Sequence, residues 1–320
     1  MKPIHLKVEA RGEYDYEGID GETMHENTGL RGNIVDFKLE GNISPHFSYT
    51  YRQRLNTINK DSSFFDSTDW LYLNYAPTEN WSIMAGKWVV LTGGWEFEPP
   101  PIDCFQLCEF CYNFPCYQWG VTTTYTTPKK HDNIMLQITQ SPFRRTYESS
   151  SGKGAQMYGY GLIWMASHGI YKPLWSINFF EREPGRFMNT IGLGNRFNFG
   201  KKIEWDVDFL NRACSDQVYL FKDFSVMSRF CYKFSRRFNA FAKVSYDTNK
   251  SGTNYDRTIF DGTEITRVGA GVEFYPLKND NVRLHANYSY SFGKNTNENG
   301  YLQDNQSLVS VGVSWQMKIL

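Results

Sequence analysis

Four cysteines gather in one short segment of the chain. They are Cys104, Cys108, Cys111 and Cys116, with the spacing C-x3-C-x2-C-x4-C. Taken as one set, they match neither the usual zinc pairs nor the common ferredoxin runs. In an oxidising envelope disulfides are the first expectation, although an i,i+4 or i,i+7 pair on a helix is poorly placed for one. Packed free thiols are the second interpretation and metal binding the least favoured, so we expect no metal and no cofactor.

These cysteines lie in residues 91–116, which we call the constriction loop. Three prolines at 99–101 end any strand, and Asp103 is positioned to cap a short helix on which Cys104, Cys108 and Cys111 share one face. The loop is rich in aromatic residues and has no Lys or Arg. We therefore expect it to pack inside the fold, with its site residues being Trp95, Glu96, Asp103 and Glu109.

Basic side chains form a second candidate site. Five of them fall on four consecutive strand-like runs, where their parity places them on the polar face, and we call them the basic stripe: Arg229, Lys233, Lys243, Arg267 and Arg283. A basic wall along an aqueous path favours anions. The alternative is that the stripe pairs with acids of the constriction loop, namely Glu96, Glu98, Asp103 and Glu109.

Other chemical signatures are weak. The six His lie mostly in turns and at run ends without ligand spacing, and no phosphate-binding glycine loop occurs. His285 and Ser289 lie near each other on one polar face, where a lining role is favoured over hydrolysis. The formal net charge is zero, which implies no bulk attraction to nucleic acid. We expect neither an enzyme nor a nucleic-acid partner.

The elements that must position these residues are strands. From Val309 to Ile319 apolar and polar side chains alternate with period two, which places each kind on its own face. Comparable runs recur about sixteen times, at 6–16, 30–43, 47–55, 70–75, 81–90, 117–126, 133–140, 158–167, 174–182, 187–199, 203–212, 221–234, 238–246, 266–275, 282–292 and 308–319. Since no helical segments are available to cover so many apolar faces, lipid is the remaining partner.

Composition and connectors favour the same fold. Aromatic residues make up 17% of the chain, as expected for two membrane-interface girdles, and short polar connectors alternate with long ones. A soluble β-sandwich or propeller would have shorter runs and fewer aromatics. We predict a single-domain antiparallel transmembrane β-barrel over 1–320, with short periplasmic turns, long extracellular loops and the third long loop folded inward. The start at Met1, without an apolar segment, is taken as a mature or engineered one.

The chain resembles the phosphate-selective porin O and P family, in the divergent branch common in Bacteroidota. The resemblance is carried by Ala85-Gly86-Lys87, Gly93-Gly94-Trp95-Glu96 and Pro101-Ile102-Asp103. It implies a sixteen-stranded trimeric outer-membrane porin whose lumenal Arg and Lys pass anions such as phosphate, with Lys87 and the basic stripe as anion contacts. The cysteine-rich loop without a cation departs from the family, so phosphate selectivity is not carried over.

These observations predict a bacterial outer-membrane porin for passive diffusion of small anionic or neutral solutes, with a mild anion preference. Its expected partners are outer-membrane lipid and further copies of itself, as a trimer, or other proteins of a membrane complex. The alternative is a plugged, non-conducting barrel that acts as a structural subunit of a larger outer-membrane assembly.

Overall fold

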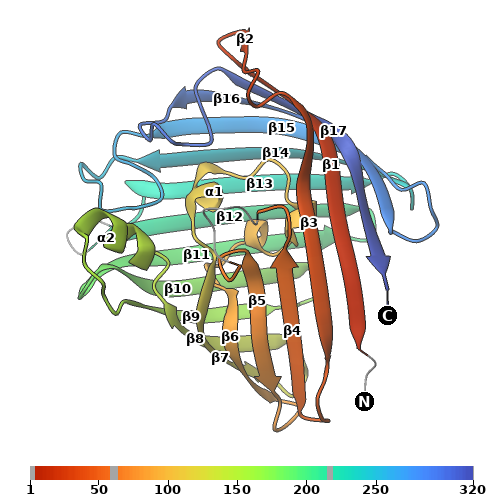
Figure 1. Ribbon diagram of the computed structural model, residues 1–320, viewed down its shortest axis with the longest axis vertical. Coiled ribbons are helices and arrows are strands. Elements are labelled where there is room, and N and C mark those ends of the chain that lie inside the picture. The colour runs from red at the N-terminus through yellow and green to blue at the C-terminus, as the bar shows by residue number, and fades with distance from the viewer. Residues whose placement is uncertain (1–3, 58–63, 215–218, 320) are drawn as a thin grey trace.

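The computed structural model describes residues 4–57, 64–214 and 219–319, and it is a closed antiparallel β-barrel (Figure 1). The described part contains sixteen long strands and one two-residue strand, β2. The strands are β1 (His5–Ile19), β2 (Glu22–Thr23), β3 (Gly29–Asn42), β4 (Phe47–Arg54), β5 (Thr68–Tyr75), β6 (Trp81–Val89), β7 (Tyr117–Thr126), β8 (Asp132–Gln140), β9 (Tyr158–Ala166), β10 (Tyr171–Glu183), β11 (Arg186–Phe199), β12 (Ile203–Cys214), β13 (Asp223–Lys233), β14 (Phe238–Asn249), β15 (Glu264–Phe274), β16 (Val282–Lys294) and β17 (Gln306–Lys318). The predicted fold and all sixteen predicted runs are confirmed.

The first and last strands close the sheet. β1 pairs with β3 on one side and with β17 on the other, in a register that runs from Lys7 opposite Lys318 to Ile19 opposite Gln306. Closure leaves no edge with unpaired backbone groups, which is what a sheet surrounded by lipid requires.

The two faces of the wall have the polarity predicted from the alternation. In β8, Leu136 and Ile138 are 60% and 53% exposed on the outside, whereas Gln137 between them is 3% exposed. β15 repeats the pattern, with Val268 outside at 41% and Arg267 inside at 4%. Apolar side chains therefore face outward and polar side chains face the lumen, the reverse of a soluble barrel.

Short helical segments lie in the long loops. The constriction loop contains the 3-10 helices η1 (Trp95–Phe97) and η2 (Pro101–Asp103) and the helix α1 (Glu109–Asn113), and the next long loop contains α2 (Arg144–Ser151), which the sequence did not predict. In Figure 1 the constriction loop lies within the ring of strands. No helix in the described residues is long and apolar enough to cross a membrane.

The predicted helix through the cysteines is wrong in extent. α1 begins only at Glu109, with Cys108 as its N-cap, and Cys104 lies outside it. The last of the three prolines, Pro101, begins the 3-10 helix η2 instead, and Gln106 has a positive φ of 55°, which breaks a right-handed helix. Cys104, Cys108 and Cys111 consequently do not share a helical face.

Two glycines of β11 allow the constriction loop to approach the wall. A Cβ on Gly192 would lie 2.1 Å from the carbonyl oxygen of Thr92, and a Cβ on Gly194 would lie 2.6 Å from the Cα of Gly94. These separations leave no room for a side chain on either glycine. The backbone of the loop therefore passes close to the inner face of the wall at the two positions where β11 has no side chain.

Candidate functional site

The constriction loop is held by arginines of the lumenal wall through its own backbone carbonyls. Arg11 Nη1 on β1 donates to the oxygens of Pro101, Ile102 and Cys104 at 3.2, 3.1 and 3.0 Å. Arg283 Nη2 on β16 donates to the Ile102 oxygen at 2.8 Å. A loop that crosses a lumen leaves carbonyls without secondary-structure partners, and these cations satisfy them.

Arg267 on β15 holds the next stretch of the loop. Its Nη1 donates to the Leu107 oxygen at 2.8 Å, and its Nε and Nη2 donate to Ser289 Oγ at 3.0 and 2.8 Å. Its guanidinium also lies 5.4 Å from the ring centre of Tyr301. All of these partners are neutral, so the positive charge of Arg267 remains part of the local field.

Two acids of the loop pair with the basic stripe. Glu96 Oε1 accepts a hydrogen bond from Lys243 Nζ on β14, and Asp103 Oδ1 lies 2.7 Å from Arg283 Nη1. Arg283 also contacts Glu273 Oε1 of β15 at 3.1 Å. Pairing with loop acids, the alternative left open by the sequence, is therefore present at these two positions.

Aromatic and amide side chains fit the centre of the loop to the wall. The Phe105 ring lies between Arg11 and Arg283, whose guanidinium carbons are 4.8 and 5.2 Å from its centre. Gln106 Nε2 donates to the carbonyls of Ala270 and Tyr288 at 3.1 and 3.0 Å. These contacts fix the loop against β15 and β16 and complement the arginine bonds.

Wall carboxylates hold the backbone N–H groups of the loop. Asp208 Oδ2 on β12 accepts from Glu96 N at 2.9 Å, and Asp247 on β14 accepts from the N–H groups of Glu109 and Phe110 at 3.0 and 3.3 Å. The first N–H groups of a helix have no partner within it, so Asp247 satisfies two donors of α1.

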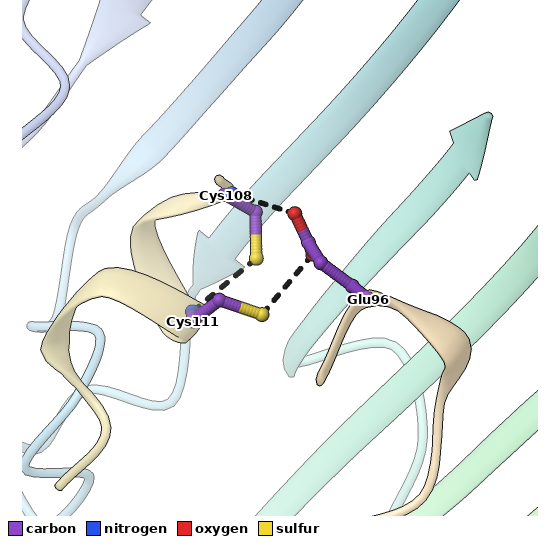
Figure 2. Close-up of side chains that lie close together, drawn as sticks. All are labelled: Glu96, Cys108 and Cys111. Atoms are coloured by element: carbon purple, nitrogen blue, oxygen red, sulfur yellow. Dashed lines mark hydrogen bonds between the residues drawn. The ribbon is translucent and has the colours of Figure 1, made fainter. Parts of the chain in front are cut away.

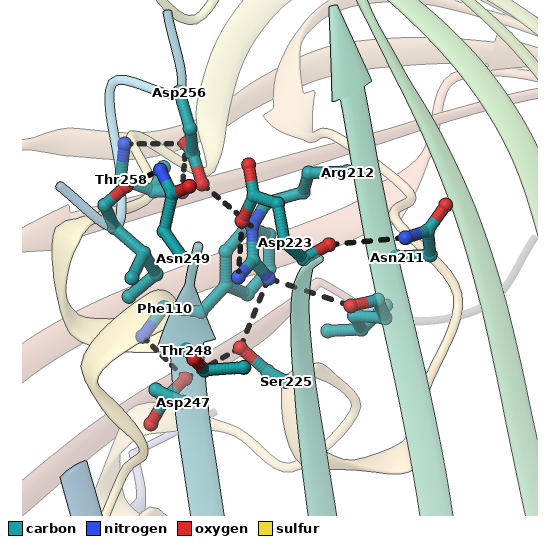
Figure 3. Close-up of polar contacts among 12 residues, drawn as sticks. Phe110, Asn211, Arg212, Asp223, Ser225, Asp247, Thr248, Asn249, Asp256 and Thr258 are labelled. Carbon is teal, nitrogen blue, oxygen red and sulfur yellow. Dashed lines mark hydrogen bonds and ion pairs between the residues drawn. The ribbon is translucent and has the colours of Figure 1, made fainter. Parts of the chain in front are cut away.

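A buried cluster around Arg212 extends this attachment (Figure 3). Arg212 Nε donates to Asp256 Oδ2 at 2.6 Å, and its Nη1 donates to Ser225 Oγ at 2.9 Å. Asp223 Oδ1 lies 2.9 Å from Nη2, and the Phe110 ring of the constriction loop packs 4.9 Å from the guanidinium carbon. The cluster joins β12, β13, the loop at 250–263 and α1 on one side of the lumen.

No disulfide joins any of the six cysteines, all of which lie in the described residues. The disulfide expected among Cys104, Cys108, Cys111 and Cys116 is therefore not seen. Cys104 Sγ donates to the Pro99 oxygen at 3.4 Å, while Cys108 and Cys111 are buried beside Glu96 (Figure 2). Packing of thiols, the second interpretation, describes this arrangement.

Burial and the neighbouring Lys243 shift the pKa values of Cys108 and Glu96 in this part of the loop. It raises the pKa of the Cys108 thiol to about 12, because a buried thiolate is poorly solvated. Burial alone would also raise the pKa of Glu96, but the ammonium of Lys243 and hydrogen bonds from Lys243 and Cys111 lower it below its ordinary value. Glu96 is therefore a carboxylate at neutral pH, beside two neutral thiols.

The side chains of the remaining site residues predicted from the sequence make other contacts. Lys87 is buried, and its Nζ donates at 2.9 Å to the oxygen of Phe65, which lies in the loop before β5. Arg229 keeps 32% of its side chain exposed and contacts Glu204 at 3.3 Å, and Lys233 is exposed at the end of β13.

Trp95 is buried, with Nε1 donating to the Lys172 oxygen at 3.0 Å. Glu109 Oε2 accepts from the N–H of Leu302 at 2.8 Å.

Sequence reasoning missed several residues that attach the loop. Arg11, Asp208, Arg212 and Asp247 were not among the predicted site residues. Their strand parity was a signal that they face the lumen, but nothing in a period-two pattern indicates which loop a lumenal side chain meets.

Comparisons with known proteins agree with this architecture. The family model for phosphate-selective porin O and P matches residues 6–168. A comparison with curated protein sequences found no match.

Several solved structures share the fold at low sequence identity. An anion-selective porin from Comamonas acidovorans aligns with a TM-score of 0.70 and 10% identity over 98% of this chain and 99% of that one. The outer-membrane channel DcaP of Acinetobacter baumannii aligns with a TM-score of 0.68 and 12% identity over 98% and 96%. The trimer form of OmpT from Vibrio cholerae aligns with a TM-score of 0.62 and 10% identity over 98% and 99%. At these identities the likeness establishes the barrel fold alone.

Proposed function

This chain belongs to the phosphate-selective porin O and P family, and we propose that its channel passes small anions in preference to cations. It is an outer-membrane porin, and its fold is that of a channel. The observation that carries the proposal is the constriction loop, which has no Lys or Arg of its own and is attached to cations of the wall. The positive charge at the narrow part of the lumen therefore comes from the wall, whereas the loop itself contributes the acids Glu96, Glu98, Asp103 and Glu109.

The basic residues have two different roles in this proposal. Lys243, Arg267 and Arg283 hold the loop, and of these Arg267 bonds to neutral groups and leaves its charge uncompensated locally. Lys233 is exposed and Arg229 is half-buried and paired with Glu204, and both lie toward the short turn between β13 and β14, where ions enter or leave. Direct anion contact is assigned to these two residues, and Lys87 adds to the positive field from the opposite wall.

The test is the reversal potential in a salt gradient across a planar bilayer. The double substitution Arg229→Glu and Lys233→Glu changes the lumenal charge by four units without touching the loop contacts. One unit charge about 4 Å from a permeating ion in water is worth about 1 kcal/mol, or about fivefold in permeability ratio, so a clear shift toward cations is expected.

The matched control is Lys129→Glu with Lys130→Glu. These two lysines are exposed in the short turn between β7 and β8, and Lys130 pairs with Glu79 there. The control makes the same change in total charge and should leave the reversal potential close to that of the unaltered protein. An unaltered protein that prefers cations would refute the anion proposal, and an equal shift in the control would refute the assignment to Arg229 and Lys233.

A trimer is the proposed assembly. The support is the family membership and the trimer form of the OmpT structure, which has the same fold. Native mass spectrometry in mild detergent tests it, with a monomer as the contrary result.

A plugged barrel is the second candidate, and a specific contact favours it. The constriction loop bonds to two other long loops: Glu109 accepts from Leu302 N at 2.8 Å, and Asn113 Nδ2 donates to the Thr258 oxygen at 3.0 Å. Loops joined in this way could close the lumen and make the barrel a rigid subunit of an assembly. A protein that forms no channel in bilayers and co-purifies with stable partners would support this candidate over the porin.

A further inference from the structure

Three potential metal ligands converge within the constriction loop. The side chains of Glu96, Cys108 and Cys111 each present one ligand atom, and these atoms lie within 4.8 Å of one another. Figure 2 shows Glu96 on the turn at η1 pointing toward Cys111 of α1 and toward Cys108, the N-cap of that helix. Cys108 is fully buried and Cys111 is 8% exposed, so the cluster lies in the packed part of the lumen.

The local spacing suits a tetrahedral ion. Cys108 and Cys111 form a C-x2-C pair, a spacing that recurs in zinc sites, and Glu96 supplies a carboxylate from outside the pair. Cys111 Sγ lies 3.1 Å from Glu96 Oε2, and Cys108 Sγ lies 3.3 Å from Cys111 N. Metal–sulfur bonds of about 2.3 Å at a tetrahedral angle place two sulfurs about 3.8 Å apart, so small side-chain rotations bring the three ligands to one ion.

The net charge of the cluster stays the same when one divalent ion replaces the two thiol protons. The Glu96 carboxylate pairs with the ammonium of Lys243, and the two thiols carry their protons as ordinary cysteines do at neutral pH, so the charges of these four groups sum to zero. A divalent cation that displaces both thiol protons leaves two thiolates, one carboxylate, the ammonium and the ion, which also sum to zero. Since uncompensated charge in a buried site is very costly, this equality removes the main objection to an ion there.

Glu96 is already oriented for binding through one oxygen. Its Oε1 accepts from Lys243 Nζ and from the N–H of Cys108, the latter at 3.0 Å, while Oε2 faces Cys111 Sγ. Hydrogen bonds of this kind fix a ligating carboxylate and are part of a functional metal site. Cys104 Sγ is directed to the carbonyls of Pro99 and Pro100, so it is not counted among the ligands.

We propose that Glu96, Cys108 and Cys111 bind one thiophilic divalent cation of the zinc class inside the barrel. Binding exchanges two protons for one ion: M²⁺ plus two thiols gives the metal dithiolate plus two H⁺, without any change in oxidation state. The ion ties η1 to the start of α1 and so stiffens the constriction loop.

Cobalt(II) is the probe, because thiolate coordination gives it an intense near-ultraviolet charge-transfer band. The full chain in detergent, reduced and stripped of metal, should develop this band and saturate at one equivalent. Zinc should displace the cobalt and abolish the band. Cys108→Ser and Cys111→Ser should each weaken binding at least about tenfold, the lower end of what loss of a supporting group costs a metal site.

Cys104→Ser is the matched control, since it removes a thiol from the same loop that bonds elsewhere. It should change the affinity by less than about twofold, and heat-modifiable migration on gels checks that each variant keeps its barrel. Two results would overturn the proposal: no charge-transfer band in the reduced protein, or a band that Cys104→Ser weakens as much as Cys108→Ser does. Neither result bears on conductance, so the channel proposal is tested separately.

Discussion

Replacing Arg11 with Met tests whether wall cations hold the constriction loop in the lumen. Arg11 donates three hydrogen bonds to loop carbonyls at 3.0 to 3.2 Å. Methionine keeps the length and much of the contact with Phe105 but removes the charge and the donors.

The expected loss of stability is smaller than the contribution of three full hydrogen bonds. The Ile102 oxygen keeps Arg283 at 2.8 Å, and the Pro101 oxygen keeps the N–H of Cys104 at 3.2 Å. The Cys104 oxygen loses the donor seen here. A hydrogen bond with a charged donor contributes about 1.5 to 3 kcal/mol, so we expect about 2 kcal/mol less stability for the closed loop. At about 1.4 kcal/mol per factor of ten, the population of open loops rises about 30-fold.

Thiol alkylation measures that population. The Cys108 side chain has no exposed surface, so a maleimide reaches it only when the loop opens. When reclosing is faster than alkylation, the rate follows the opening equilibrium. With a chelator present and with modification at each cysteine read by peptide mass spectrometry, Arg11→Met should accelerate alkylation of Cys108 about 30-fold.

Two controls separate local opening from unfolding. Arg229→Met removes a wall arginine that contacts Glu204 and the Phe241 ring, and it should leave the Cys108 rate unchanged. Cys231, which is buried in β13, is the internal reference. An acceleration below about twofold at Cys108, or an equal acceleration at Cys231, would refute the reasoning.

Three further predictions concern the same loop. Phe110→Ala should destabilise it by about 3 to 5 kcal/mol, because the 1% exposed ring fills an apolar core, and the measurement is the thermal transition of the near-ultraviolet circular dichroism. Gly192→Ala should displace the loop entry, because the new Cβ would meet the Thr92 oxygen at 2.1 Å, and single-channel conductance should change while the barrel still folds. Lys243 keeps the pKa of Glu96 below its ordinary value of 4.5. The stabilisation that this ion pair gives the loop is therefore complete above pH 4.5 and is lost as the pH falls below that value. Tryptophan fluorescence followed to acid pH should show this transition, and the Glu96→Gln variant should lack it.

The barrel was predictable because its signal is local and repeated. Each strand places alternate side chains on opposite faces, so the pattern around Leu136 to Ile138 can be read without knowing any neighbour. The inward position of the constriction loop followed from its order along the chain and its aromatic composition.

The attachment of the loop was not predictable, since it depends on contacts between residues far apart in sequence. Arg11 meets carbonyls about ninety positions away, and neither partner has a pattern that names the other. The prediction for the cysteines failed for a related reason. It treated the four cysteines of the loop as one set, whereas the structure places Cys104 apart from Cys108 and Cys111 and brings Glu96 next to them. Local backbone breaks at the prolines and at Gln106 decided that separation.

Single-channel conductance tests the central claim most directly, namely that this barrel is a water-filled channel narrowed by the constriction loop. The unaltered protein should insert into a planar bilayer and give discrete open steps, and a variant with residues 95–113 replaced by a short Gly-Ser linker should give larger ones in the same salt. A silent unaltered protein, or equal steps in the two proteins, would contradict the account.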